Sequence, residues 1–268
     1  MAEMDYDELR GRYEHVYVQS GRLFENECRS IEAALEASFS CYFSLRKDRM
    51  DERAQFLAAF FYRNCVYLSA TYHMIRNGML DPAGNNMRTV FETIIWLYAY
   101  HSDDGIYANF RQLNDLDAEK FRLIKSGGWS HTKERKLENL RRKYSFQKTM
   151  KKLYSKEAFE KLFFNQYWVL CQKSHSSIFG VNHNTPNMEG TTTLEKRPDE
   201  MKDNLTATAY LAVENITSLL NCLSGHLPQE RIDRLLDVIN RVNRTIPPAP
   251  GLAPDTLELE FTVRFRKV

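Results

Sequence analysis

The sequence has few cysteines and no closely spaced pair of them. It contains five, an odd number, and no two of them form a Cys-x-x-Cys pair. They are spread along the chain as Cys28, Cys41, Cys65, Cys171 and Cys222. This spacing does not fit a zinc knuckle and does not indicate a disulfide framework. Because their neighbours are apolar, we expect reduced cysteines in the core of a cytoplasmic protein.

A targeting signal and an uninterrupted apolar run are also lacking. Residues 1–15 are acidic and polar, whereas a signal peptide begins with basic residues that an apolar run follows. The longest apolar stretch, residues 56–75, is interrupted by Arg63, Asn64 and His73, and polar groups are costly at membrane depth. We therefore expect no membrane partner, and we interpret this stretch as the central helix of a soluble bundle.

The common motifs of nucleotide and metal sites are absent as well. The sequence contains no Walker loop, GxGxxG, GxSxG or kinase signature, and neither HExxH nor ExxH. We expect no cofactor. A metal site formed by Glu92, His175 and His183 is disfavoured, because a separation of eight residues between the two histidines fits no compact metal motif.

What the sequence does contain is helical periodicity along most of its length, with apolar residues at spacings of three and four. We expect one or two helices over residues 7–45 with Gly21 as the weak point, a helix over 52–76 ending at Asn77-Gly78, and a loop over 80–86. Further helices are expected over residues 87–101, 103–125, within 133–156, over 156–173, 198–223 and 229–243, with a long loop over 174–197. The predicted fold is all-α, a multi-helix bundle around the central apolar helix, in a single domain of residues 1–245.

Residues 246–268 predict a different kind of structure. Residues 246–251 contain three prolines and indicate a stiff linker. Apolar and polar residues then alternate over 257–265, which predicts one short C-terminal β-strand. A single strand has to pair with a sheet edge or with another chain. A homodimer is therefore one expected assembly.

Three polar residues stand out against their apolar surroundings. Arg88 and Glu92 are four residues apart on an apolar predicted helix, so they share one of its faces. His175 is predicted at the end of a later helix, where the helix dipole favours its charged form. We predict that the helical scaffold gathers these three side chains into one polar cluster. This cluster either fixes helix packing or forms a catalytic set.

Arg88-x-x-x-Glu92 on an apolar helix, together with Ser174-His175 at a later helix end, resembles a large family of uncharacterised prokaryotic α-helical proteins. The resemblance covers roughly residues 52–183. That family is known mainly as a domain of unknown function, so the resemblance implies a helical fold and no particular activity.

The architecture is also similar to HEPN-like helical domains, some of which are ribonucleases in defence or toxin systems. Their usual signature is an Arg, a polar residue and then a His four to six positions after the Arg. Here Arg63-Asn64 is followed by His73, ten positions after the Arg. This sequence departs from that signature, so a metal-independent ribonuclease would need Arg88 and His175 to meet from separate helices. In that hypothesis His175 is the general acid and base and Arg88 stabilises the charge on the phosphorane.

One segment is strongly basic although the net charge of the chain is only +2. From Lys133 to Lys156 there are ten Lys or Arg residues against two Glu. The candidates for contacts with nucleic-acid phosphates are Arg135, Lys136, Arg141, Arg142, Lys143, Lys151 and Lys152, with Lys148 beside them. Tyr144, Phe146 and Tyr154 are candidates for stacking on bases. The alternative interpretation is a solvated helix without a specific partner.

Two functional hypotheses follow from these observations. The first is a binding or interaction module with an internal Arg/Glu/His cluster and a basic flank that contacts nucleic acid. The alternative is a metal-independent ribonuclease that uses His175 and Arg88. An open cleft at the cluster favours the enzyme, whereas a cluster sealed beneath Trp96, Tyr167 and Trp168 favours a structural role.

Overall fold

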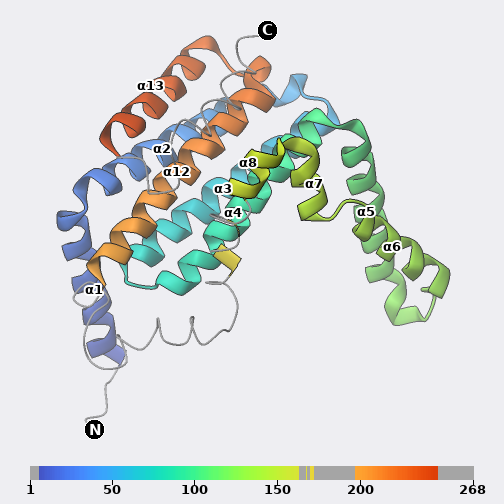
Figure 1. Ribbon diagram of the computed structural model, residues 1–268, viewed down its shortest axis with the longest axis horizontal. Coiled ribbons are helices and arrows are strands. Elements are labelled where there is room, and N and C mark those ends of the chain that lie inside the picture. The colour runs from blue at the N-terminus through green and yellow to red at the C-terminus, as the bar shows by residue number, and fades with distance from the viewer. Residues whose placement is uncertain (1–5, 163–166, 168–169, 172–196, 247–268) are drawn as a thin grey trace.

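Helices make up all the regular structure that the computed structural model of this chain describes, residues 6–162, 167, 170–171 and 197–246 (Figure 1). The α-helices are α1 (Tyr6–Leu23), α2 (Glu25–Ser44), α3 (Glu52–Arg76), α4 (Leu80–Ser102), α5 (Asp104–Leu123), α6 (His131–Lys143), α7 (Phe146–Leu153), α8 (Lys156–Glu160), α12 (Pro198–Leu223) and α13 (Gln229–Thr245). Short 3-10 helices cover Lys47–Arg49, Ile124–Ser126 and Ser224–His226. The predicted all-α class is confirmed for this part of the chain. The predicted strand over 257–265 and residues 247–251 of its linker lie outside the described residues.

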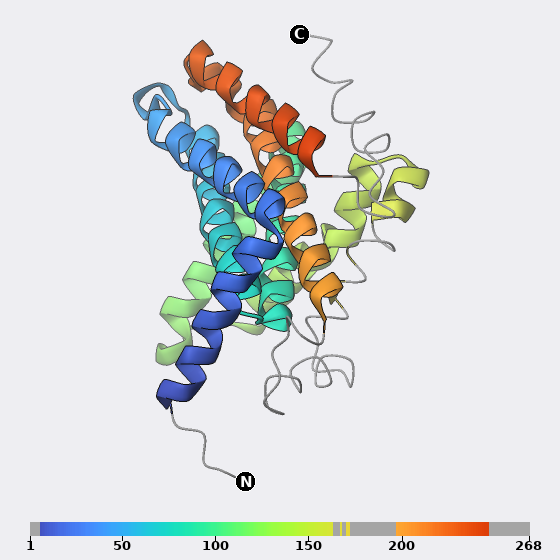
Figure 2. The same cartoon turned by 90° about the vertical axis from the view of Figure 1, so that its left-hand side faces the viewer.

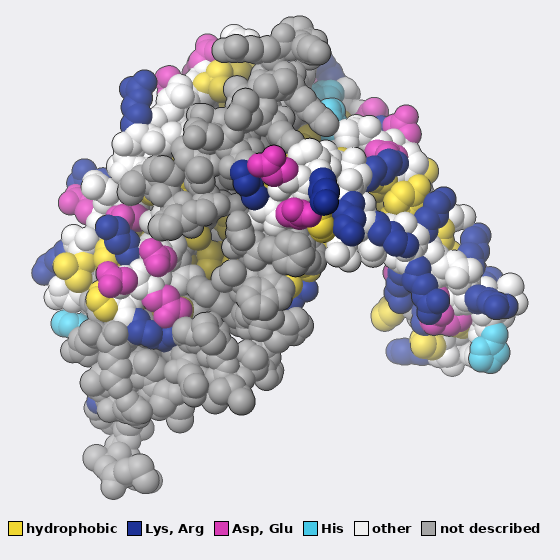
Figure 3. Space-filling view, viewed as in Figure 1, with side chains coloured by type: hydrophobic (Ala, Val, Ile, Leu, Met, Phe, Trp, Pro, Cys, Tyr) yellow, Lys and Arg dark blue, Asp and Glu magenta, His cyan; other side chains and the backbone are white. Residues whose placement is uncertain are grey.

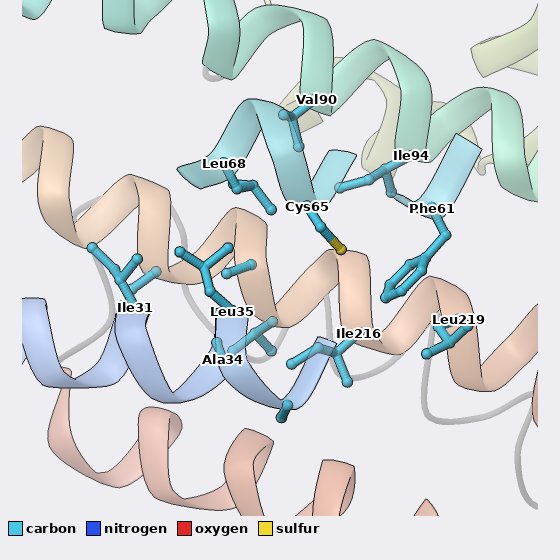
Figure 4. Packing of buried hydrophobic residues seen from close by; sticks show 14 of the residues in the cluster. Ile31, Ala34, Leu35, Phe61, Cys65, Leu68, Val90, Ile94, Ile216 and Leu219 are labelled. Atoms are coloured by element: carbon cyan, nitrogen blue, oxygen red, sulfur yellow. The ribbon is translucent and has the colours of Figure 1, made fainter. Parts of the chain in front are cut away.

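The apolar stretch 56–75 lies within α3, which packs against α4, α12 and α2. Figure 4 shows the centre of this core, where the side chains of α3 point toward those of the three neighbouring helices. Cys65 and Phe61 are fully buried there, between Ile94 of α4 and Ile216 of α12. In the described part of the chain, none of the helices is long and apolar enough to cross a membrane.

Local capping explains why α3 begins and ends where the sequence predicts. The side chain of Asp51 accepts a hydrogen bond from the backbone N–H of Ala54 at 2.7 Å, which caps the first turn. At the other end, Gly78 adopts a φ of 79°, in the left-handed region that glycine favours. The N–H groups of Gly78 and Met79 donate to the carbonyl groups of Ile75 and Met74, the pattern of a Schellman motif.

The predicted loop over residues 80–86 is wrong, because α4 begins at Leu80 and includes all of it. Pro82 lies in the first turn of the helix, where its missing N–H removes no intrahelical hydrogen bond. Leu80, Ala83 and Met87 form one buried stripe along the first two turns. Burial of the stripe against the core therefore outweighs the loop-like composition of the segment.

The long N-terminal helical pattern is divided into two helices at Phe24. This residue has φ −119° and ψ 43°, which interrupts the helix between α1 and α2. The break lies three residues after Gly21, the predicted weak point, and Gly21 itself is helical. Figure 2 shows α2 lying alongside α13, while α1 continues from α2 beyond the break.

A second apolar cluster and an arm extend from the C-terminal half of α4. The cluster joins α4 to α7 and α8 through Phe91, Ile95, Met150, Phe159 and Leu162. The arm is the antiparallel hairpin of α5 and α6, which leads away from the other helices (Figure 1). The bundle around α3 thus carries two attachments, and those sequence-predicted site residues that the structure describes lie on or beside them.

Candidate functional site

Arg88 and Glu92 lie on α4 at the edge of the second apolar cluster. Nε of Arg88 donates to Oε1 of Glu92 at 2.9 Å. The side chain of Arg88 is 28% exposed and that of Glu92 is 30% exposed. The hydroxyl group of Tyr167 donates to the same Glu92 oxygen at 2.8 Å and accepts from a terminal nitrogen of Arg88 at 3.3 Å. The predicted polar pair therefore exists, and a tyrosine 75 residues away from Glu92 completes it.

The aromatic ring of Tyr167 anchors this arrangement from the apolar side. Its centroid lies 4.7 Å from that of Phe146 on α7 and 6.0 Å from that of Phe91 on α4. The guanidinium of Arg88 lies 5.5 Å from the centre of the same ring. Tyr167 therefore holds the chain beyond α8 against α4 by both ring packing and hydrogen bonds.

Arg88 is charged and Tyr167 is neutral around neutral pH. Burial, followed by the hydrogen bond to Glu92, raises the pKa of Tyr167 above its ordinary value. Burial opposes the charged form of Arg88, but the hydrogen bond with Glu92 and the nearby Tyr167 outweigh it, so the pKa of Arg88 is raised. A charged arginine and a neutral tyrosine fit a fixed hydrogen-bonded clamp better than a proton-transfer site.

His175, the third member of the predicted cluster, lies outside the described residues. His183 and Trp168 lie outside them too. The part of the hypothesis that the structure describes is the Arg88–Glu92 pair, which Tyr167 covers on one side. The gathering of His175 with the pair stays a prediction.

The basic segment forms two helices, α6 and α7, separated by Tyr144 and Ser145. On α6, the buried Leu137 faces α5, and ion pairs flank it on the hairpin. These pairs join Lys133 to Glu119 at 2.6 Å, Lys120 to Glu134 at 2.7 Å and Arg141 to Asp117 at 2.8 Å. Part of the basic charge therefore closes the hairpin of the arm.

The remaining basic residues of α6 are Arg135, Lys136, Arg142 and Lys143, and all four are exposed. With 3.6 residues per turn, they project from the half of the helix that faces away from Leu137. We call them the outer face of α6. Glu138, at the edge of this half, lies 3.7 Å from Arg142, and no other ion pair of these four residues occurs within the described ranges.

The lysines of α7 mostly hold neighbouring elements. Lys152 forms an ion pair with Asp103. The hydrogen bond from Lys152 lowers the pKa of Asp103 below its ordinary value. Lys148 donates to the carbonyl group of Arg142 at 3.0 Å, at the end of α6. Lys151 lies 5.2 Å from the ring centre of Phe159. Figure 3 shows Lys and Arg side chains following α7 and the arm on one face of the molecule.

The aromatic residues proposed for stacking on bases are engaged within the fold. Phe146 packs against Trp96 and Tyr167, and Tyr154 joins the second apolar cluster. Tyr144 is half-buried against the main core. The most exposed large apolar residue of the described chain is Phe121 on α5, at 78%. Sequence reasoning missed it because it lies outside the basic segment.

Comparisons of this chain with protein-family models, with curated proteins and with solved structures give no match. The resemblances to the uncharacterised prokaryotic family and to HEPN-like domains therefore stay predictions. The functional argument depends on the geometry of the described residues.

Proposed function

We propose that this protein is a nucleic-acid-binding module that contacts phosphate groups through the outer face of α6. The observation that carries the proposal is the division of charge on α6. Lys133 and Arg141 pair with α5, whereas the outer face presents four exposed cations with one acidic residue at its edge. These four cations take no part in the ion pairs that close the hairpin, so their side chains can contact an anionic ligand.

The chemistry of the outer face suits phosphate groups. Arg135 and Arg142 are two turns apart, which corresponds to about 10 Å along the helix axis. Each guanidinium presents a planar fork of donors that matches phosphate oxygens, and Lys136 and Lys143 add point charges beside them. Neutralising phosphates releases counterions, so such a face binds nucleic acid with a strong dependence on salt.

The Arg88–Glu92–Tyr167 cluster has a structural role in this proposal. It fixes α4 to the chain beyond α8 and so supports the second apolar cluster, on which α7 lies. The ion pair of Lys152 with Asp103 then ties α7 to the start of α5. The clamp thus positions the base of the arm, while the outer face of α6 makes the contacts with the ligand.

A charge-neutralisation experiment tests the proposal. The variant Arg135→Gln, Lys136→Gln, Arg142→Gln and Lys143→Gln removes the outer face and keeps good helix formers at each position. Its matched control, Arg22→Gln, Arg49→Gln, Arg241→Gln and Arg244→Gln, removes four exposed cations from α1, the 3-10 helix Lys47–Arg49 and α13. Both variants have the same net charge, so general electrostatic attraction changes equally in both.

Fluorescence anisotropy with labelled RNA and DNA at several salt concentrations provides the measurement. We expect weaker binding by the outer-face variant and a smaller slope of log K against log salt. The slope falls by about 0.7 per lost contact on a single strand and about 0.9 on a B-form duplex. The control variant keeps most of the affinity. Equal losses in the two variants, or no binding by the wild-type protein, would overturn the proposal.

A further inference from the structure

The end of α5 and the 3-10 helix Ile124–Ser126 that follows it carry two apolar side chains that the described part of the chain leaves largely exposed. Phe121 is 78% exposed and Ile124 is 58% exposed, which makes this the most exposed apolar spot on the arm. Phe121 makes no ring contact with another described residue. Figure 3 shows hydrophobic side chains reaching the surface of the arm among Lys and Arg side chains.

The ion pairs of the hairpin place Phe121 at the level of the first turns of α6. Lys120 pairs with Glu134, and Glu119 pairs with Lys133, so the residues next to Phe121 along α5 are in register with the beginning of α6. Arg135 of the outer face belongs to the same layer of the hairpin. An exposed aromatic ring and an exposed guanidinium therefore lie at one level of a slender arm.

The other aromatic residue at this end of the arm is engaged. Nε1 of Trp129 donates to Glu134 at 2.6 Å, and the ammonium groups of Lys120 and Lys133 lie 5.9 and 6.0 Å from its ring centre. Trp129 thus stabilises the turn between α5 and α6. Phe121 plays no such part in the hairpin, and its ring is open to a ligand.

The charge of the arm indicates which occupant suits this ring. Over the whole arm, from Asp104 to Lys143, there are ten Lys or Arg residues against six Asp or Glu, so the arm is net positive and the occupant should be anionic. It should also present a flat apolar surface to Phe121. Single-stranded nucleic acid has both properties, because its bases are unpaired and can stack on an aromatic side chain. In a duplex the bases stack on one another, and their faces are closed to Phe121.

We propose that the arm binds single-stranded nucleic acid, with Phe121 as a stacking platform for a base and the outer face of α6 holding phosphates further along the same strand, where the strand passes around the arm. This inference rests on the proposed function and names its substrate class. Base stacking on one aromatic side chain changes affinity by roughly 5- to 100-fold. The ring carries no charge, so it contributes affinity without changing the dependence on salt.

The test compares Phe121→Ala with two matched variants. Phe43→Ala removes another strongly exposed phenylalanine, 70% exposed at the end of α2, where its ring contacts Tyr42 and Tyr62. Phe121→Trp keeps an aromatic platform at the same position. The probes are a labelled single-stranded RNA of mixed sequence, the DNA strand of the same sequence, and each strand annealed to its complement.

We expect Phe121→Ala to weaken binding of the single strands roughly 5- to 100-fold with an unchanged salt slope. Phe43→Ala and Phe121→Trp retain wild-type affinity, and duplex binding is weaker and insensitive to Phe121. Full affinity in Phe121→Ala, or preferential binding of duplexes, overturns this inference. The proposed function stands in that case if the outer-face variant still loses binding. No binding by the wild-type protein overturns the proposed function as well. Binding of phosphatidylserine vesicles or of an acidic protein in preference to both strands overturns the inference in favour of that partner.

Discussion

The guanidinium of Arg76 on α3 occupies the space where a side chain at Gly21 of α1 would lie. This guanidinium donates to the carbonyl group of Tyr17 at 2.5 Å and to the hydroxyl group of Tyr72 at 2.8 Å, and it lies 3.7 Å from the ring centre of Tyr17. Arg76 as a whole is only 8% exposed. The buried cation therefore needs glycine on α1 in order to reach its partners.

We expect Gly21→Ala to destabilise the protein although alanine is the better helix former. The added Cβ collides with the Arg76 guanidinium, which cannot move without losing its hydrogen bonds to α1 and to Tyr72. Overpacking of this kind costs about 1–3 kcal/mol, whereas the gain in helix propensity is about 0.5–1 kcal/mol. Urea unfolding should show a net loss of about 1 kcal/mol.

Gly11→Ala is the matched control on the same helix. A Cβ at Gly11 meets nothing within 4 Å, so only the gain in helix propensity remains. We expect this variant to be more stable than the wild type by about 0.5–1 kcal/mol. Equal stability of the two alanine variants would show that Arg76 adjusts without cost.

A comparison of Gly21 with the ends of α3 and α12 shows which features of the fold can be predicted from the sequence. The ends of α3 and the start of α12 follow from local signals, Asp51 and Gly78 for the former and Pro198 for the latter. These signals act through hydrogen bonds and dihedral angles within a few residues, so they can be read from the chain. The role of Gly21 depends on Arg76, which is 55 residues away, and its sequence neighbours do not reveal it.

The same limit explains the outcome for the candidate site. The i,i+4 spacing predicts the Arg88–Glu92 pair, because both residues lie on one helix. It does not predict Tyr167, whose position depends on how the chain beyond α8 packs on α4. The count of basic residues likewise predicts a charged segment, but the register of the hairpin decides that Arg141 pairs with Asp117 while Arg135 faces outward.

Removal of one hydroxyl group tests the structural role of the clamp. Tyr167→Phe keeps the ring contacts with Phe91 and Phe146 but removes the hydrogen bonds with Arg88 and Glu92. We expect a loss of about 1–2 kcal/mol in unfolding free energy, because a half-buried charged pair loses a partner. Thermal and urea unfolding provide the measurement.

Tyr62→Phe is the control for this substitution. The ring of Tyr62 contacts Tyr42 and Phe39, and its hydroxyl group makes no hydrogen bond with another described residue. We expect its stability to stay within about 0.5 kcal/mol of the wild type. A Tyr167→Phe variant as stable as this control would mean that ring packing alone fixes the segment.

The stability of the protein should depend on pH through Glu214 of α12. Burial raises the pKa of this half-buried carboxyl group from 4.5 to about 7. Because the pKa of Glu214 is higher in the folded state than in the unfolded state, protonation of this carboxyl group stabilises the folded state. The full stabilisation is present below about pH 4.5. This contribution is lost as the pH rises through about 7.

Glu214→Gln removes the charge and keeps the shape of the side chain. We expect it to be more stable than the wild type by about 1–3 kcal/mol at pH 8 and to be similar to it at pH 4. Urea unfolding across this pH range measures the difference. Glu230→Gln, at an exposed position in the first turn of α13, should show no such gain at alkaline pH. Parallel pH profiles for wild type and Glu214→Gln would contradict the assignment to Glu214.

The ribonuclease alternative makes a prediction that separates it from the binding module. For Arg88 to stabilise a phosphorane, its guanidinium has to bind the phosphate with N–H groups other than those that donate to Glu92 and Tyr167 at 2.9 and 3.3 Å. The Glu92 carboxylate, paired with the same guanidinium, partly neutralises its charge and repels an anionic phosphate. We therefore expect labelled RNA to stay intact with the wild-type protein and with His175→Ala, under conditions in which the wild type binds it. RNA cleavage by the wild type that is lost in both His175→Ala and Arg88→Ala would contradict this, because the two side chains would then act in one site.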